Sequence, residues 1–352
     1  MSKNALYVLD TEPLIIHGIT WRHVLNPVWT YGPLLKGRQA YFLLSLSWSL
    51  LDTERLKHMV LHYHIYKENF PEHTIIILCN EKEEVTLLRR FHIPAIFANH
   101  NALLDYSIYK PAPECEKLYD GILNSRLDRW KRHILARTLT RPALITYGFL
   151  NTPAEHTYLA WLRRAFPHGC FLNYAENGEY NWLAADELGR AYSQSYTGLI
   201  LSAVEGACFT SCEYLLAGLP VASTKNLGGR DVFFSPEFTR TVEASQDAVR
   251  DAVEDLKSRA LRPEDIRAAT ITRIDELRTG FIEAWQTAYD REGVCKDARV
   301  EWTNKYRNKM VVTLSDAEVP AYLSSSGALG PCTAEMPAPW DNNEVLHHHS
   351  HL

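Results

Sequence analysis

Hydrophobic residues in the first third of the chain form short runs separated by amphipathic stretches. Short apolar runs predict strands, and apolar residues that recur every three or four positions predict helices. The predicted order is strand 5–9, strand 40–46, helix 52–70, strand 74–79, helix 81–91 and strand 94–98. This alternation is typical of a small α/β unit with a mostly parallel sheet.

A second alternation of strands and helices begins at Tyr119. The predicted order is strand 121–125, helix 131–138, strand 143–147, helix 153–166, strand 170–173, helix 186–195, strand 198–202, helix 208–217, strand 220–224 and helix 246–260. In the last of these helices Val249, Val253, Leu256 and Ala260 recur at helical spacing, which places one apolar face against a sheet. Repeated βα steps of this kind predict a doubly wound domain.

A pair of prolines marks the expected boundary between the two halves. Pro111 and Pro113 both oppose regular structure, because proline lacks a backbone N–H and restricts the residue before it. We therefore expect one domain in residues 1–112 and a second in residues 113–275.

A long helical pattern starts at Pro263 and continues to Tyr289. Gly280 interrupts it, and because a glycine inside a helix costs about 1 kcal/mol relative to alanine, it indicates a bend or a close packing contact. Residues 296–352, whose last part is rich in Ser, Gly, Pro and Ala, are expected to form an irregular tail. We interpret the His-rich end, 347–351, as a mobile end or an expression tag rather than as a metal site.

Composition narrows the class of protein. The 352 residues, 46% of them hydrophobic, are enough for two cores. A net charge of -5 disfavours sequence-independent binding of nucleic acid, which needs a basic surface. The seven cysteines are scattered and odd in number, which argues against a disulfide framework or a zinc ribbon. Residues 1–20 do not read as a secretion signal, and the longest apolar stretch, 40–51, is too short to span a bilayer. We therefore expect a cytoplasmic protein with reduced thiols.

Two glutamates in the stretch 198–234 carry the chemistry that we expect. Glu205 lies in the loop after a predicted strand, and Glu213 lies eight residues later on the first turns of the next helix. Both face the carboxyl edge of the sheet, where open α/β folds bind ligands. A helix that begins near Cys208 presents free N–H groups to a diphosphate, and carboxylates bind the vicinal hydroxyls of sugars.

This stretch resembles the family 4 retaining glycosyltransferases, whose hallmark is two glutamates separated by seven residues, then a Gly-x-Pro-Val strand and a Gly-Gly loop. The matching elements are Glu205 and Glu213, residues 218–221, and Gly228 with Gly229. The resemblance implies that Glu205 contacts the hydroxyls of the donor sugar and that Glu213 contacts the ribose. The glycine pair would let the backbone approach the donor closely.

The same family places an arginine and a lysine, with four residues between them, where the first strand of the nucleotide domain meets its helix. Here these are Arg126 and Lys131. The resemblance implies that they neutralise the diphosphate leaving group during a front-face transfer that needs no metal. The sequence has no compelling Asp-x-Asp pair, so we expect neither a metal nor another cofactor.

Further site residues are expected around this motif. Ser202, at the end of a strand, is expected to bind the donor, whereas Arg230 is either a donor contact or part of a surface ion pair with Asp231. We interpret Cys208 and Cys212 as small packing residues. The family often sets a histidine of the first domain near the donor, for which the candidate is His100; the histidines that compete with it are His17, His23, His62 and His64.

The resemblance covers about half of the chain, from Tyr119 to Tyr289. It implies the α/β fold called GT-B, with two Rossmann-like domains, the N-terminal one small, and a crevice between them. Residues 276–295 would cross back to pack on the first domain. The expected function is retaining transfer of a sugar from a nucleotide sugar to a glycan or glycolipid acceptor, in the synthesis of a bacterial-type polysaccharide or glycoconjugate.

Other functions stay open, because the same fold hosts nucleotide-sugar epimerases and phosphorylases. A catalytically silent subunit that binds a sugar nucleotide is a third possibility, favoured by the short first domain. Peripheral association with the inner face of a membrane is left open, and the sequence does not predict the oligomeric state, the base, the sugar or the acceptor.

Overall fold

The computed structural model of the chain describes residues 3–20, 23–112, 114–148, 152–175 and 179–329. Its internal contacts divide the chain into two compact units. Unit 1 joins residues 1–100 to residues 278–352, and unit 2 is the continuous segment 101–277. The divisions therefore fall near residues 100 and 277, whereas the sequence led us to expect limits at 112 and 275.

Unit 1 contains a six-stranded sheet. Its strand order is β12 (Val312–Ser315), β1 (Lys3–Thr11), β2 (Leu14–Ile19), β3 (Ala40–Ser45), β4 (His73–Cys79) and β5 (Ala95–Phe97). Strand β1 is antiparallel to both of its neighbours, and β2 to β5 run parallel. The parallel part agrees with the alternation seen in the sequence, although β2 and the short helix α1 (Asn26–Tyr31) were not predicted.

One face of this sheet carries the larger apolar core of unit 1. Residues in register across the strands, such as Ile16, Phe42 and Ile75, point to that face and are fully buried. The elements packed there are α1, α2 (Thr53–Asn69), α3 (Lys82–Arg90) and α10 (Val319–Ser325). Helix α2 begins where predicted, because the Asp52 side chain accepts a hydrogen bond of 3.1 Å from the Arg55 backbone N–H.

The other face of the sheet is covered by the end of a long helix. Helix α8 spans Pro263–Arg291, and its residues from Arg278 onward belong to unit 1. There the Phe281 ring lies 5.0 Å from the ring of His17 on β2. A Cβ on Gly280 would lie 2.1 Å from the carbonyl oxygen of Phe97, so the glycine marks a close packing contact.

The expectation of an irregular tail over residues 296–352 is wrong for its described part. That part contains helix α9 (Ala298–Lys305), strand β12 and helix α10. Strand β12 pairs with β1, and Val319 and Leu323 are buried in the core of unit 1. Composition misled us, because such short elements depend on tertiary partners more than on their own propensities. The His-rich end at 347–351 lies outside the described residues.

Unit 2 contains a parallel six-stranded sheet. Its strand order is β11 (Thr239–Val242), β10 (Val221–Thr224), β9 (Gly198–Ile200), β6 (Gly121–Arg126), β7 (Pro142–Tyr147) and β8 (Cys170–Phe171). The chain starts in the middle at β6, builds outward to β8, and then returns to build β9, β10 and β11 on the other side. The order of the strands therefore reverses between β6 and β9, which is the arrangement of a doubly wound fold.

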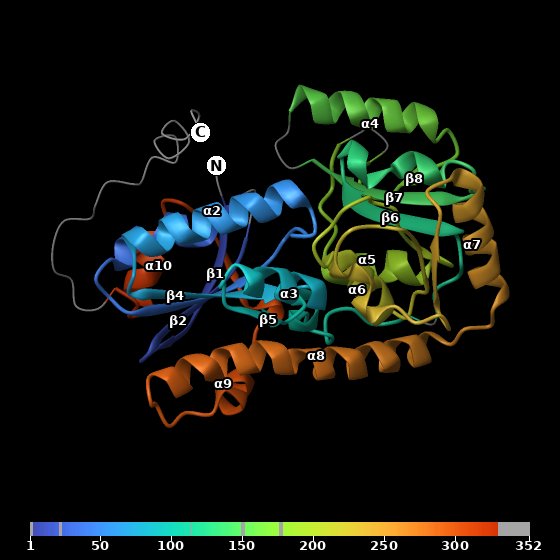
Figure 1. Cartoon of the computed structure of the whole chain (residues 1–352). Coiled ribbons are helices and arrows are strands. Elements are labelled where there is room, and N and C mark those ends of the chain that lie inside the picture. The colour runs from blue at the N-terminus through green and yellow to red at the C-terminus, as the bar shows by residue number, and fades with distance from the viewer. Residues whose placement is uncertain (1–2, 21–22, 113, 149–151, 176–178, 330–352) are drawn as a thin grey trace. The chain divides into compact units, whose positions relative to one another are not determined.

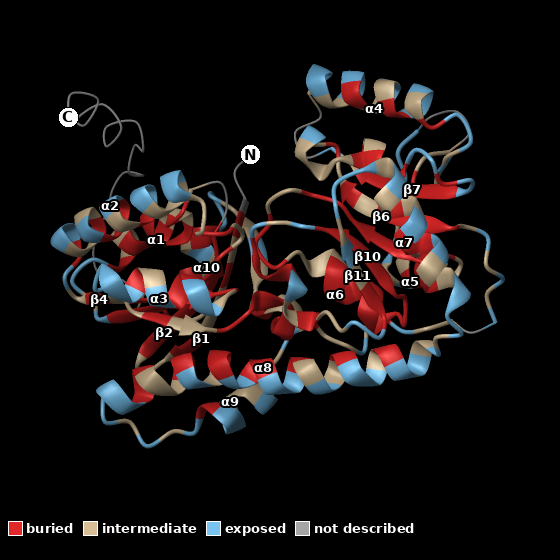
Figure 2. Ribbon diagram, turned by 45° about the vertical axis from the view of Figure 1, so that its right-hand side comes forward, coloured by how far each residue is buried: buried red, intermediate tan, exposed pale blue. Residues whose placement is uncertain are grey.

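Helices cover both faces of the unit 2 sheet (Figure 1). Helices α4 (Pro153–Ala165) and α7 (Gln246–Ser258) pack on the face that carries Leu123 and Leu144. Helices α5 (Ala185–Ser193) and α6 (Phe209–Leu216) lie on the opposite side. Strands β9 and β10 are buried along their whole length, whereas α4 exposes much of its outer side (Figure 2). The predicted stripe of α7 is buried at Val249, Val253 and Leu256, but Ala260 is exposed beyond the helix end.

The predicted helix over residues 131–138 does not form. The chain instead makes two 3₁₀ turns, Arg129–Lys131 and His133–Ala136. Arg132 lies between them in the left-handed conformation, with φ 51° and ψ 40°, which an α-helix cannot accommodate. No helix in the described ranges combines the length and the apolar character that crossing a membrane requires.

Candidate functional site

Polar residues gather at the carboxyl ends of the strands in unit 2. Arg126 is the last residue of β6, Tyr147 is the last of β7, and Thr224 is the last of β10. Ser202 follows shortly after the end of β9. Doubly wound sheets bind their ligands at this edge, where the strand order reverses.

Lys131 and Glu205 meet at this edge, although they come from the loops after two different strands. The Lys131 Nζ forms an ion pair with Glu205 Oε1, and the two side chains are 12% and 8% exposed. The Ser202 hydroxyl donates a hydrogen bond of 2.5 Å to the same carboxylate oxygen. The structure thus brings together three residues that the sequence marked as site candidates.

Arg126 and Lys131 share one aromatic ring. The Arg126 guanidinium lies 5.4 Å from the centre of the Trp130 ring, and the Lys131 ammonium lies 4.4 Å from it. A tryptophan face attracts cations, so Trp130 interacts with both positive charges. Arg126 also forms an ion pair of 3.1 Å with Asp128.

The Glu213 side chain on α6 lies near two tyrosines, Tyr109 and Tyr147. Glu213 is 6% exposed, and the Tyr109 hydroxyl donates a hydrogen bond of 3.0 Å to Glu213 Oε1. The pKa of Tyr147 is raised by burial and then by Glu213, Cys208 and Glu205, while Arg126 opposes the rise. Tyr147 therefore lies within electrostatic reach of both glutamates and of Arg126, which the sequence did not reveal.

Gly228 is needed for a close backbone contact that the sequence did not show. Gly228 adopts φ 128° and ψ 157°, and a Cβ there would lie 2.1 Å from the carbonyl oxygen of Glu205. The Glu205 backbone N–H also donates a hydrogen bond of 2.9 Å to the carbonyl oxygen of Leu227. Gly228 therefore lets the loop after β10 lie against the loop that carries Glu205. Gly229 is buried at the start of the 3₁₀ helix Gly229–Phe233.

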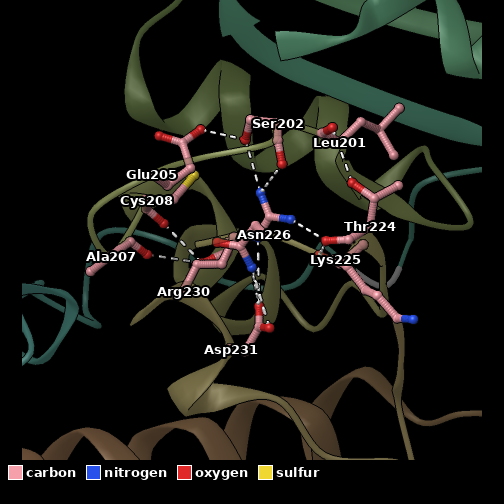
Figure 3. A network of polar contacts seen from close by, with 12 residues as sticks. Leu201, Ser202, Glu205, Ala207, Cys208, Thr224, Lys225, Asn226, Arg230 and Asp231 are labelled. Carbon is pink, nitrogen blue, oxygen red and sulfur yellow. Dashed lines mark hydrogen bonds and ion pairs between the residues drawn. The ribbon is translucent and has the colours of Figure 1, made fainter. Parts of the chain in front are cut away.

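Arg230 does form an ion pair with Asp231, but it is not a plain surface pair, because the Arg230 side chain is 0% exposed while that of Asp231 is 45% exposed. It donates hydrogen bonds of 3.0 Å and 2.8 Å to the carbonyl oxygen and the hydroxyl of Ser202, and another to the carbonyl oxygen of Thr224 (Figure 3). Its Nε lies 3.5 Å from a carboxylate oxygen of Asp231. In this structure Arg230 holds Ser202, which in turn bonds to Glu205.

Arg132 is a site residue that the sequence did not mark. Its guanidinium donates a hydrogen bond of 2.5 Å to the carbonyl oxygen of Leu201 and one of 2.8 Å to the Thr224 hydroxyl. These bonds tie the loop after β6 to the ends of β9 and β10. Because they depend on the left-handed backbone at Arg132, no residue pattern signals them.

His100 belongs to unit 1 and is held there. Its Nδ1 lies 2.9 Å from the carbonyl oxygen of Leu46, and its backbone N–H donates a hydrogen bond of 3.1 Å to the Asn80 side chain. Burial lowers the pKa of His100 to about 3, so the ring is neutral and its Nδ1 carries the proton. The contacts of Glu205 with Lys131 and Ser202 join residues of unit 2.

The cysteines near α6 behave as packing residues. Cys212 is fully buried, and burial raises the pKa of Cys208 to about 11, so that thiol stays neutral at physiological pH. Within the described residues, no three His, Cys, Asp or Glu side chains are grouped so that they could hold a metal ion.

Comparisons with known proteins find the same fold. Sucrose-phosphate synthase from Thermosynechococcus elongatus superimposes with a TM-score of 0.52 at 14% identity, over 79% of this chain and 73% of that chain. Anabaena HepE, solved in complex with UDP, superimposes with a TM-score of 0.53 at 15% identity, over 74% of this chain and 76% of that chain.

A third solved structure, trehalose-6-phosphate from E. coli bound with UDP-2-fluoro glucose, gives a TM-score of 0.51 at 11% identity, over 73% of this chain and 68% of that chain. No protein-family model matches the sequence, and no curated protein does. At such low identities the likeness shows the fold and not the reaction. The chain has the GT-B fold of these glycosyltransferases, with two Rossmann-like α/β units.

Proposed function

We propose that this protein is a glycosyltransferase that takes a sugar from a nucleotide sugar and transfers it with retention of configuration. The observation that carries the proposal is the contact between Lys131 and Glu205, supported by Ser202, at the reversal point of the unit 2 sheet. A cation and a carboxylate that meet there match two adjoining parts of a nucleotide sugar, the diphosphate and the hydroxyls of the sugar.

Arg126 and Lys131 would bind the diphosphate. Each contacts the Trp130 ring, so both cations are available at the end of β6 and in the loop that follows it. When the bond between the sugar and the diphosphate breaks, negative charge grows on the leaving oxygen. Fixed cations stabilise that charge more than they stabilise the intact donor, so they lower the barrier without a metal.

Glu205 and Glu213 would bind hydroxyls of the donor, the first on the sugar and the second on the ribose. Glu205 accepts hydrogen bonds from Lys131 and Ser202, which orient its carboxylate. Glu213 accepts one from Tyr109. An ionised carboxylate can accept further bonds from a vicinal diol, so these contacts are compatible with ligand binding.

The acceptor in this proposal is a glycan or glycolipid that enters from unit 1. His100 is the residue of unit 1 that we propose acts near the donor. Because the His100 ring is neutral and its Nδ1 is bound to a backbone carbonyl, it would act by orienting a substrate and not as a charged group. We further propose that the enzyme acts in cytoplasmic polysaccharide or glycoconjugate synthesis, with peripheral association at a membrane.

The first experiment is a thermal-shift screen with UDP-, GDP-, ADP- and CMP-sugars. A ligand present at 100 times its dissociation constant stabilises the folded state by about 2.7 kcal/mol. Product analysis with the sugar that binds separates the possible reactions, because an epimerase needs no acceptor and a phosphorylase needs free phosphate. Donor hydrolysis by the intact protein would argue against a silent binding subunit.

Three substitutions then test the residue roles. Glu213→Ala is expected to weaken donor binding by about tenfold or more, the effect of one lost hydrogen bond to a charged group. Arg126→Ala and Lys131→Ala are expected to lower kcat more than they raise KM, because they act mainly on the departing diphosphate. Steady-state kinetics with the identified donor measures both effects.

Arg190→Ala is the control for these variants, since Arg190 forms an exposed ion pair with Asp186 on α5. Turnover close to wild type in all three site variants would refute the assignment of the site.

A further inference from the structure

Tyr147 occupies a place at the candidate site for which neither the sequence motif nor its family resemblance accounts. It ends β7, directly in register with Arg126 at the end of β6. Residues in register across a sheet point to the same face, so the two side chains leave the same edge on the same side.

That side is the one covered by α5 and α6. Asn124 lies two residues before Arg126 on β6 and therefore points to the same face. Its side chain donates a hydrogen bond of 2.6 Å to the hydroxyl of Tyr192 on α5, and its backbone N–H donates one of 2.7 Å to the hydroxyl of Tyr214 on α6. Glu213 neighbours Tyr214 in α6, so Tyr147 shares this face with the helix that carries Glu213.

The Tyr147 side chain is half-buried, and its hydroxyl makes no hydrogen bond to any residue that the structure describes. Nearby phenols differ in this respect. The hydroxyls of Tyr109, Tyr192 and Tyr214 all have protein partners. A half-buried donor without a protein partner, beside a cation and close to the start of α6, is placed to serve a bound ligand.

We propose that the Tyr147 hydroxyl donates a hydrogen bond to the diphosphate of the nucleotide sugar, which makes it a further donor-binding residue. The inference rests on the proposed function. Among the neighbouring groups, Arg126 is the cation assigned to the diphosphate, and Cys208 begins the helix whose N–H groups would face an anion. A neutral phenol adds a donor to this anion site without adding charge.

Burial and the nearby Glu213 keep the Tyr147 pKa above its ordinary value, so the hydroxyl retains its proton at physiological pH. Among the carboxylates, Glu213 raises the pKa of this phenol more than Glu205 does.

Tyr147→Phe tests the inference, because it removes the hydroxyl and keeps the ring. The matched control is Tyr119→Phe. Tyr119 is a partly exposed tyrosine just before β6, at the opposite edge of the same sheet. The probe is whichever of UDP, GDP, ADP and CDP binds the wild-type protein most tightly by calorimetry, together with the nucleoside of the same base.

Tyr147→Phe is expected to weaken binding of the nucleoside diphosphate about tenfold, the effect of one hydrogen bond to a charged group, and to leave binding of the nucleoside unchanged. Tyr119→Phe should leave both affinities within about twofold of wild type. Since the Tyr147 hydroxyl has no partner in the described protein, its removal leaves no group unsatisfied, and the melting temperature should stay that of wild type.

Three outcomes would overturn the inference. Wild-type affinity in Tyr147→Phe would show that the hydroxyl does not touch the ligand, and an equal loss for the nucleoside would place the contact on the ribose or the base. If Arg126→Ala weakens binding while Tyr147→Phe does not, only this inference fails. If none of the four nucleoside diphosphates binds the wild-type protein, the proposed function fails with it.

Discussion

Two arginines, the half-buried Arg132 and the fully buried Arg230, organise the candidate site. Arg132 and Arg230 both bind Thr224, the first through its hydroxyl and the second through its carbonyl oxygen. Each also binds the chain just beyond β9, at Leu201 or at Ser202. The two cations thus bind carbonyl oxygens at the ends of the parallel strands, and they hold the loops that carry Lys131 and Glu205.

Arg230→Met is expected to lower the free energy of unfolding by about 3 kcal/mol, because the carbonyl oxygens of Ser202 and Thr224 and the Ser202 hydroxyl would lose a buried charged donor. Urea denaturation measures this loss. Arg190→Met, which breaks only the exposed pair with Asp186, should change stability by less than about 0.5 kcal/mol. Equal stabilities of the two variants would contradict the role given to Arg230.

Buried histidines make stability depend on pH. Burial lowers the pKa of His17 from an ordinary 6.5 to about 4, and the ring binds the Met310 carbonyl oxygen at 2.8 Å and the Ser45 hydroxyl at 2.9 Å. Between these pKa values the unfolded chain binds more protons than the folded chain. The stabilisation is therefore complete above pH 6.5 and is lost as the pH falls toward 4.

His17→Gln removes this titrating group. Between about pH 7 and about pH 5, wild-type protein is expected to lose about 2 kcal/mol more stability than the variant. Urea denaturation at the two pH values gives the difference, in which contributions from His100 and His133 cancel. Parallel losses in both proteins would show that folding does not lower the pKa of His17.

At the scale of elements, glycines in two helices have opposite reasons to be there. Gly280 in α8 lets the helix approach β5, since a Cβ would lie 2.1 Å from the Phe97 carbonyl oxygen. Gly189 in α5 has more room, and a Cβ there would have Lys110 O at 3.7 Å as its nearest neighbour. Helix propensity favours alanine at both positions by about 1 kcal/mol, so packing decides the difference.

Gly280→Ala is accordingly expected to destabilise the protein by about 1–3 kcal/mol, because α8 must move away from β5. Gly189→Ala is expected to stabilise it by about 0.5–1 kcal/mol. Thermal and urea denaturation of the pair provide the comparison. A stabilised Gly280→Ala variant would mean that α8 does not pack as closely as described.

At the scale of the whole molecule, unit 1 is discontinuous in sequence. Its sheet needs β12 beside β1, and its core needs Val319, Leu323 and Ala328 of the C-terminal segment. Unit 2 is one continuous segment, 101–277. The two units should therefore respond differently to loss of the chain end.

A chain that ends at Met310 is expected to lose about 5 kcal/mol or more, since burying each large aliphatic side chain contributes about 1.5–3 kcal/mol. That is a large part of the stability of an ordinary domain. Limited proteolysis should then digest unit 1 and leave a fragment close to residues 101–277. A chain that ends at Leu329 keeps the described contacts and is the control. Equal protease resistance of both chains would contradict the contribution of β12 and α10.

Local patterns in the sequence were sufficient to predict most of the secondary structure and the location of the candidate site. Most strands and helices of the two sheets follow from apolar periodicity, because each of these elements buries a face whose spacing is set by its own backbone geometry. Strands β2 and β11 were not predicted. The spacing of Glu205 and Glu213 and of Arg126 and Lys131 likewise marked one edge of the unit 2 sheet, because loops that follow parallel strands leave from the same edge.

Only the tertiary structure decided the rest. The left-handed Arg132, the burial of Arg230, the contact of Gly228 with Glu205 and the pairing of β12 with β1 all join residues far apart in the chain. The place of Tyr147 beside Arg126 also comes from the pairing of two strands. Such contacts are stabilised by partners that the local sequence does not contain, so no local pattern predicts them.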